Sequence, residues 1–521
     1  RFEEAWNNVL LYSEHTWGAF CSISKPASPF TADQWNIKQS YATAANLQSR
    51  QLLVEAAQCG PGPGPDPAAR AGAASCVDIF NTASWPRAGL ALIPHELSDA
   101  GDLATDAGGE PVFSQRLSSR ELAVLVRDMP PFSGRRLTIS RAPASSGPAM
   151  IENRASADAA SATLENGNLR VRLDPRTGSI IELRAKGIDA NLVDASGGHA
   201  INDYLYLIGD DPSDLQRAGP PRITVGERGP LVASLRVESD APGCHALSRE
   251  VRLAAGADHA ELINTVDKKR IAAASYHDRE GKESVNFAFP FNVPDGEMGL
   301  DVPLAVIRPE HDQMPSACKN WLTVGRWADI SNRDYGITWV TLDAPLVQVG
   351  GITATLLNSQ TNPDAWRKRI EPTQKLYAWA MNNHWGTNYR AYQEGPVTFR
   401  FILRPHRGTT PAGASRFATG LSQPLVALPG RGAAPGAAPL LQIDPPEVLV
   451  TALKPSDDGR ALIVRLLGAS AKPSHATLTW PDRKPGALWF SDTSERPVRK
   501  LEGPIPVPSW GLVTLRAELA E

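Results

Sequence analysis

The sequence predicts a mainly β protein that begins with a helical segment. Glycine (42) and proline (44) together exceed one residue in seven of the 521, which favours many turns and therefore many short strands. Apolar and polar residues alternate along much of the chain after about residue 76, as they do in half-buried strands. A clear helical period is confined to the first 58 residues.

Composition bounds the class of protein. Hydrophobic residues make up 42% and charged residues 21%, as in ordinary folded chains, and 521 residues at about 100–200 per domain indicate several domains. A net charge of -3 argues against nucleic acid or an anionic membrane as the main partner. No run approaches about 18 consecutive apolar residues, so we expect no membrane-spanning helix. The five cysteines form no CxxC pair, and there is no P-loop, HExxH or GxSxG.

Residues 1–58 are expected to form a helical middle domain, part of a three-helix bundle. Thr31 and Gln34 have the spacing of a capping box, so a second helix is expected to begin near Thr31. Residues 59–75 alternate proline and glycine and are interpreted as a linker. One apolar face of the first helix is built by Phe2, Trp6, Val9 and Leu10.

Three β regions follow. Residues 76–145 are expected to form a small β domain, 160–408 a large antiparallel β super-sandwich, and 441–521 a small C-terminal β-sandwich. The clearest hairpin has alternating apolar residues over 169–173, a turn at Asp174–Gly178 and a returning strand. The C-terminal strand candidates are Ala461–Leu467, Ala476–Trp480, Ala487–Phe490 and Gly511–Ala517.

The first candidate site lies where the first helix ends. Glu14 and His15 stand beside Trp17 there. An imidazole can ligate a metal, and a neighbouring carboxylate can orient its ligands. The alternative is that His15 only complements the C-terminal end of the helix dipole. Spacing by itself leaves both interpretations open.

The second candidate site is rich in side chains that bind hydroxyl groups. Planar amides beside aromatic faces are typical of sugar sites. The alternative is a polar turn whose asparagines satisfy their own backbone. The residues are Asn383, His384, Trp385 and Asn388.

A third group contains large aromatics and two carboxylates. Trp321 and Trp327 could line a groove, although packing in a core is the commoner role of such residues. Asp329 and Asp343 are candidate acids, since a general acid–base pair needs two carboxyls that face one cleft.

Several of these segments together resemble bacterial members of glycoside hydrolase family 38, the α-mannosidases. The resemblance rests on their order and spacing and covers nearly the whole chain. It is carried by Trp6, Glu14-His15-Thr16-Trp17-Gly18, Asn81 with Ser84-Trp85-Pro86-Arg87, Asn383-His384-Trp385-Gly386-Thr387-Asn388, and Arg404-Pro405-His406.

The resemblance implies a zinc-dependent, retaining hydrolase that releases α-linked mannose from oligosaccharides. In this family an N-terminal α/β domain carries the nucleophile and acid/base aspartates, and one zinc ligand is a histidine of the helical middle domain. By motif position that ligand is His15. The commoner family pattern is His-His-Asp, whereas this chain has Glu14-His15-Thr16. Substrate contacts are implied for Glu14, Trp17 and the second candidate site.

The chain starts at Arg1, inside a helix-like pattern, so we expect an upstream catalytic α/β domain in the same polypeptide. By itself the chain is expected to be inactive, with a mannose-containing oligosaccharide as the partner of the whole protein. A homo-oligomer is a further expectation of the resemblance, and the compartment stays open. The alternative function is a non-catalytic carbohydrate-binding β-sandwich protein, and a third is a structural scaffold.

Overall fold

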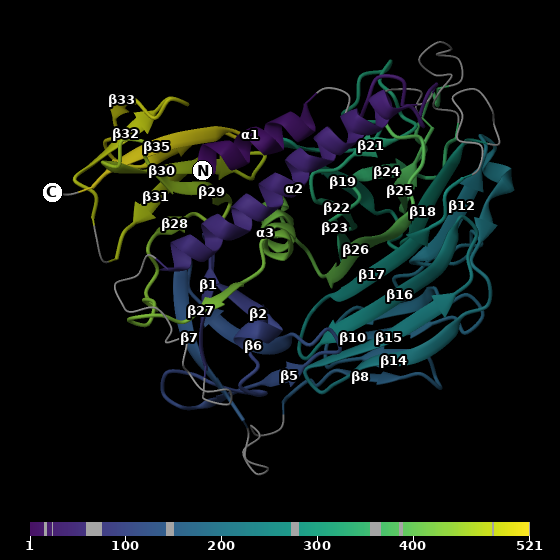
Figure 1. Ribbon diagram of the computed structural model, residues 1–521, viewed down its shortest axis with the longest axis horizontal. Helices are drawn as coiled ribbons and strands as arrows, with labels where there is room; N and C mark the ends of the chain where they lie inside the picture. The colour runs from purple at the N-terminus through teal and green to yellow at the C-terminus, as the bar shows by residue number, and fades with distance from the viewer. Residues whose placement is uncertain are drawn as a thin grey trace.

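The computed structural model confirms a mainly β chain that begins with helices (Figure 1). Within the described residues, no helix combines the length and the apolar character needed to cross a membrane. The structure describes residues 1–14, 18–22, 24–58, 75–141, 151–271, 281–354, 366–384, 389–481 and 484–519.

Helices α1 (Phe2–Ser13) and α2 (Pro29–Gln58) lie antiparallel along one side of the molecule. Asn8 donates to Gln48 (2.9 Å), and Lys38 donates to the carbonyl oxygen of Leu11 (2.9 Å). The expected start of the second helix near Thr31 is slightly wrong, because α2 begins at Pro29. Ser28 precedes it and its Oγ accepts from the amide of Thr31 (3.2 Å).

The region after residue 75 opens with two small sheets that enclose one apolar core. The strand order in the first is β27 (Val426–Pro429), β1 (Ser75–Asn81), β7 (Ser133–Ser140), β3 (Leu103–Thr105), β4 (Pro111–Val112). The second sheet has the order β2 (Arg87–Ile93), β6 (Leu122–Met129), β5 (Ser114–Arg116), and the short helix η1 (His95–Leu97) follows β2. Strand β27 enters from far along the chain and closes the edge of β1.

The largest core lies within the central β region, between a six-stranded and a nine-stranded sheet. The six-stranded order is β13 (Gln216–Arg217), β12 (Asp203–Ile208), β18 (Glu283–Pro290), β25 (Lys375–Asn382), β24 (Leu346–Val349), β21 (Leu322–Thr323). The nine-stranded order is β14 (Arg222–Arg228), β15 (Val232–Ser239), β16 (Cys244–Ala254), β17 (Ala260–Lys268), β26 (Gly395–His406), β23 (Gly336–Thr341), β22 (Trp327–Ser331), β19 (Glu297–Val302), β20 (Ala305–Ile307). Helix η2 (Pro212–Asp214) joins β12 to β13.

The predicted hairpin is part of a four-stranded sheet beside this core. Gly178 ends its turn with a φ of 71°, and a Cβ there would lie 2.3 Å from Val237, so the turn needs glycine. The sheet order is β11 (Ile180–Ala185), β10 (Leu169–Leu173), β9 (Thr163–Glu165), β8 (Ser156–Asp158).

The C-terminal region has its own apolar core. All four predicted strands are present there, each shifted by no more than two residues at either end. One sheet has the order β28 (Gln442–Asp444), β31 (Ser474–Thr479), β34 (Ile505–Val507). The other has the order β29 (Val448–Pro455), β30 (Ala461–Gly468), β35 (Leu512–Glu518), β32 (Ala487–Ser491), β33 (Pro497–Lys500).

A short helix that the sequence analysis did not anticipate, α3 (Pro411–Ser422), lies where these regions meet (Figure 1). Thr410 caps it by accepting from the amide of Gly413 (3.1 Å). Its alanine face packs on β22, β23 and β26, with Ala414 and Ala418 almost completely buried. Arg87 reaches it from β2 and donates to the carbonyl oxygens of Gly420 (2.6 Å) and Gln423 (2.7 Å).

We predict that Ala418→Leu lowers the free energy of unfolding by about 1–3 kcal/mol, because the added carbons have no space against β22. Urea or thermal unfolding measures this. Ala471→Leu, at an exposed loop position, is the matched control and should change stability little. Equal effects of the two substitutions would contradict the tight packing of α3.

Candidate functional site

Glu14, the first of the candidates, is held at the end of α1 by a lysine of α2. Lys38 Nζ lies 2.7 Å from Glu14 Oε2, and the carboxylate side chain is 55% exposed. Because Lys38 also bonds the carbonyl oxygen of Leu11, it closes the C-terminal end of α1. The carboxylate of Glu14 is therefore already paired with a cation, which makes Glu14 a weaker candidate for a metal ligand.

Asn383, which follows β25, is buried and its side chain serves the backbone. Its Oδ1 accepts from the amide of Glu283 (2.7 Å), and its Nδ2 donates to the carbonyl oxygens of Gly281 (2.7 Å) and Ala391 (2.9 Å). All three bonds fix the start of β18 and the segment before β26 to the end of β25. This arrangement favours the polar-turn alternative, because both Nδ2 hydrogens and one lone pair of Oδ1 already serve the backbone.

His384 is buried against Trp379, with 5.8 Å between the ring centroids. Its Nδ1 lies 3.1 Å from the carbonyl oxygen of Ala354, which can only accept, so Nδ1 carries the proton. The Nε2 lone pair has no hydrogen-bond partner within the described part of the chain. Burial, together with nearby Lys282, lowers the pKa of this imidazole to about 4, and the hydrogen bond that Nδ1 donates to the carbonyl oxygen of Ala354 opposes this shift.

The two candidate segments flank one aromatic cluster. Trp35 of α2 meets Tyr392 edge-on, at 6.3 Å between ring centroids. The guanidinium of Arg390 lies 4.6 Å from the centre of the Trp35 ring, and that of Arg270 lies 3.6 Å from the centre of the Tyr392 ring. Lys38, the partner of Glu14, is one helical turn from Trp35. The structure thus brings Glu14 and the segment after β25 to the same end of α2.

The remaining candidates of these segments, His15, Trp17, Trp385 and Asn388, lie outside the described residues. Among the described residues, no group of three or more His, Cys, Asp and Glu side chains is placed to hold a metal ion. With Glu14 bound to Lys38, the described side chains do not form a zinc site by themselves.

The other candidate carboxylates have structural partners. Asp329 accepts from Thr338 (2.7 Å) and lies 2.8 Å from Nε2 of His406. Asp343 pairs with Arg400 through two contacts of 2.9 Å. Trp327 is buried and donates to Ser415 of α3 (3.2 Å). The burial of Trp327 confirms its core interpretation.

One buried network near Asn383 was not anticipated. Glu283, at the start of β18, accepts from Lys268 (2.7 Å) and from the hydroxyl of Tyr206 (2.6 Å), all inside the sandwich. Burial raises the pKa of Tyr206, and Glu283 raises it further. A sequence cannot distinguish such a buried ion pair from exposed charges at strand ends, because both place Lys and Glu beside turns.

We predict that Asn383→Ala destabilises the protein by about 1–3 kcal/mol, because three buried backbone groups lose their partner. Chemical denaturation measures the change. Asn36→Ala, on the exposed side of α2, is the control and should be nearly neutral. An Asn383→Ala variant as stable as the control would refute the structural role of this amide.

We further predict that His384 makes stability depend on pH. The unfolded imidazole binds a proton below about pH 6.5, whereas the buried one does so only below about 4. Stability should therefore fall as the pH drops from 6.5 to 4, by up to about 3 kcal/mol more than in His384→Gln. Unfolding free energies of both proteins across this range test it, and parallel curves would contradict it.

Comparisons with known proteins agree with this architecture. Residues 164–365 match the family described as "Glycosyl hydrolases family 38 C-terminal domain". Mouse alpha-mannosidase 2C1 is 26% identical over 332 residues, which cover 59% of this chain and 28% of that protein.

Solved structures extend the likeness to the whole chain. An alpha-mannosidase from Enterococcus faecalis V583 matches 99% of this chain at a TM-score of 0.68 and 14% identity, and 63% of that protein is covered. A glycosyl hydrolase family 38 protein from Enterococcus faecalis matches 99% at a TM-score of 0.66, also at 14% identity, with 66% covered. This chain thus spans less than two thirds of the length of each of these relatives. Residues 164–365 thus match the family 38 C-terminal domain, and nearly the entire chain shares its fold with part of an alpha-mannosidase and part of a family 38 protein from Enterococcus faecalis.

Proposed function

We propose that this chain is the middle and C-terminal part of a zinc-dependent α-mannosidase that releases α-linked mannose from oligosaccharides. The observation that carries the proposal is the fold match over 99% of the chain to an alpha-mannosidase that is longer than this chain. The aromatic cluster of Trp35, Tyr392, Arg390 and Arg270 supports it, because it joins the helical segment to the sandwich beside both candidate segments.

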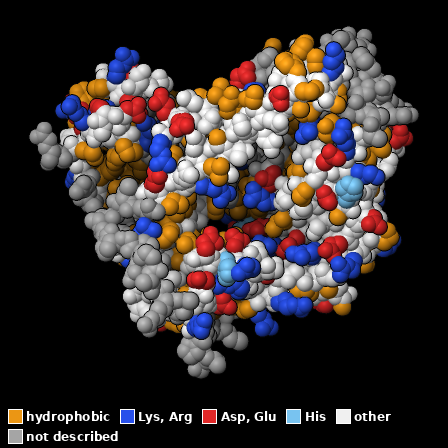
Figure 2. Space-filling model, in the orientation of Figure 1, with side chains coloured by type: hydrophobic (Ala, Val, Ile, Leu, Met, Phe, Trp, Pro, Cys, Tyr) orange, Lys and Arg blue, Asp and Glu red, His pale blue; other side chains and the backbone are white. Residues whose placement is uncertain are grey.

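The two helices offer a docking face for a catalytic α/β domain. Helix α1 fully buries only Ala5 among its side chains, and hydrophobic side chains lie on the outer surface along both helices (Figure 2). A patch of this kind on a soluble domain normally has a partner. Exposed members are Phe2 (61%), Trp6 (53%) and Leu10 (61%) on α1, and Phe30 (63%), Ile37 (53%) and Leu47 (55%) on α2.

That partner is proposed to be the part of the polypeptide that the longer relatives have and this chain does not. The apolar face favours this function over a free-standing sugar-binding sandwich, since sugar binding would not require exposed Trp6 or Phe30. A structural scaffold would need the face as well, but it would need no metal.

In this proposal His15 contributes one zinc ligand and the docked domain contributes the others. A neutral imidazole on α1's C-terminal side is a suitable zinc donor, whereas Glu14 stays paired with Lys38. When bound, zinc would polarise sugar hydroxyls and favour distortion of the ring. The proposed role of this chain is to supply His15 and residues 383–388 to the edge of the catalytic domain.

We predict that His15→Ala, in the polypeptide that carries this chain with its catalytic domain, loses most of its bound zinc. Hydrolysis of an α-mannoside should fall by more than about 100-fold, because losing a direct ligand costs more than the 10–100-fold typical of its supporting contacts. Metal analysis and a chromogenic α-mannoside assay measure both. His311→Ala, at an exposed position, is the control. Full zinc content in His15→Ala would refute the ligand role.

The chain by itself is expected to release no mannose. If residues 1–521 in isolation hydrolysed an α-mannoside at a rate comparable to that of the longer polypeptide, the proposal that a separate domain carries the catalytic residues would be contradicted.

A further inference from the structure

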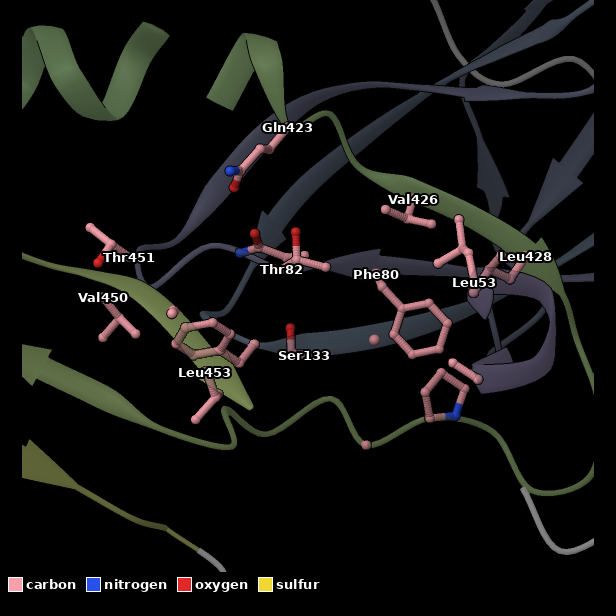
Figure 3. A pocket seen from close by; sticks show the side chains of 17 residues that line it. Leu53, Phe80, Thr82, Ser133, Gln423, Val426, Leu428, Val450, Thr451 and Leu453 are labelled. Atoms are coloured by element: carbon pink, nitrogen blue, oxygen red, sulfur yellow. The ribbon is translucent and has the colours of Figure 1, made fainter. Parts of the chain in front are cut away.

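A cavity of about 530 Å³ lies at the opposite end of α2 from the candidate site (Figure 3). It is an open cavity lined by the C-terminal part of α2, the sheet of β1, β7 and β27, and strand β29. Leu53, which lines it, is 18 residues from Trp35 on the same helix. At 1.5 Å per residue the two are about 27 Å apart. The cavity is therefore separate from the region of Glu14 and Asn383.

The walls of the cavity carry no charge. None of the residues that line it, all of them described, is Asp, Glu, Lys, Arg or His. A phosphate, a carboxylate or a metal ion would lose its hydration there without gaining a charged partner. The ligand that fits is therefore neutral.

Apolar side chains line the whole cavity, and polar side chains are concentrated toward one end of it (Figure 3). Phe80, Leu53 and Leu428 lie together at one end, and Thr82 and Gln423 lie further along the wall (Figure 3). Such a surface suits a ligand that has both C–H faces and hydroxyl groups. A purely aliphatic chain would cover Thr82 and Gln423 without satisfying them.

Two of the polar side chains are available for a ligand. Within the described residues, the side-chain amide of Gln423 and the hydroxyl of Thr82 make no hydrogen bond, and both residues are exposed. Asn81, next to Thr82, is different, since its Nδ2 donates to the carbonyl oxygen of Pro130 (2.8 Å) and to two other carbonyls. The free amide and hydroxyl are bound to water in the absence of a ligand, and sugar hydroxyls can replace that water.

The close packing of the cavity floor is a built feature. Gly134 of β7 donates to the carbonyl oxygen of Gly436 (3.0 Å), and a Cβ at Gly134 would lie 2.5 Å from Pro435 and 2.9 Å from Phe80. Glycine at this position thus lets Phe80 and Pro435 approach each other beneath the opening. Any larger residue would displace Pro435 or Phe80.

We propose that this cavity is a second glycan site, which binds a neutral oligosaccharide segment with a sugar face on Phe80 and hydroxyls on Thr82 and Gln423. Its volume lies within the range of about 300–1,000 Å³ of ligand pockets. That the sugar is mannose rests on the proposed function, whereas the site itself does not. Because three separate parts of the chain line the site, a bound oligosaccharide connects α2, the small β region and the C-terminal sandwich.

The test is calorimetric titration of residues 1–521 with neutral mannotriose, cellotriose and galactotriose. Saturable binding of at least one is expected, together with a rise in the thermal unfolding midpoint. Thr82→Ala and Gln423→Ala should each weaken it by about 3–10-fold, the equivalent of one hydrogen bond. Both side chains are exposed, so folding should be preserved. Gln51→Ala, on the opposite face of α2 from Leu53, is the control.

No saturable binding of any of the three, or binding that neither variant weakens, would overturn the proposal. Binding of a fluorescent fatty acid, weakened by Gln423→Ala, with no sugar binding would also overturn it. Cellotriose binding without mannotriose binding would support the site and count against mannose as its ligand. The zinc content and α-mannoside assays report on the proposed function separately, since no residue of this cavity is part of the candidate site.

Discussion

The packing of α3 against the central sandwich is the contact on which the arrangement of the β regions depends. Its alanine face lies on β22, β23 and β26, while Ala412 on the same helix packs with Leu449 and Ala469 of the C-terminal region. The guanidinium of Arg87, in the small β region, donates to carbonyl oxygens at the C-terminal end of α3. Small side chains are required because three bodies approach one 12-residue helix. Gln423, which directly follows α3, is one of the residues that line the cavity beside β29.

At the candidate site, the described polar side chains mostly bind backbone groups or one another. Asn383 fixes two neighbouring segments, and Lys38 closes α1 while it pairs with Glu14. His384 is the described candidate that retains a free, buried acceptor atom. This arrangement agrees with the proposal that another domain completes the site and docks on the exposed apolar face of α1 and α2. The two proposed sites are then at opposite ends of the same helix.

The sequence predicted elements whose pattern and turn chemistry agree. The hairpin of β10 and β11 was found because strict alternation meets a turn that ends in Gly178, and the C-terminal strands were found for the same reason. Helix α3 was not predicted, because a segment rich in alanine, glycine and proline has the composition of a loop. Thr410 and Pro411 do have the pattern of an N-cap followed by a first helical residue. The backbone contacts of Asn383 could not be predicted, because an amide that suits a sugar equally suits a carbonyl, and tertiary contacts decide between them. The Lys268–Glu283 pair left no sequence signal at all.

The central claim is that this chain completes the site of an α-mannosidase whose catalytic residues precede Arg1. The most direct test is the coding sequence immediately upstream of the Arg1 codon. The account predicts an open frame into an α/β domain with an Asp and a His near its start, able to join His15 at a metal, and further aspartates for catalysis. A stop codon or an unrelated domain at that place would contradict the hydrolase and leave a sugar-binding or structural sandwich protein.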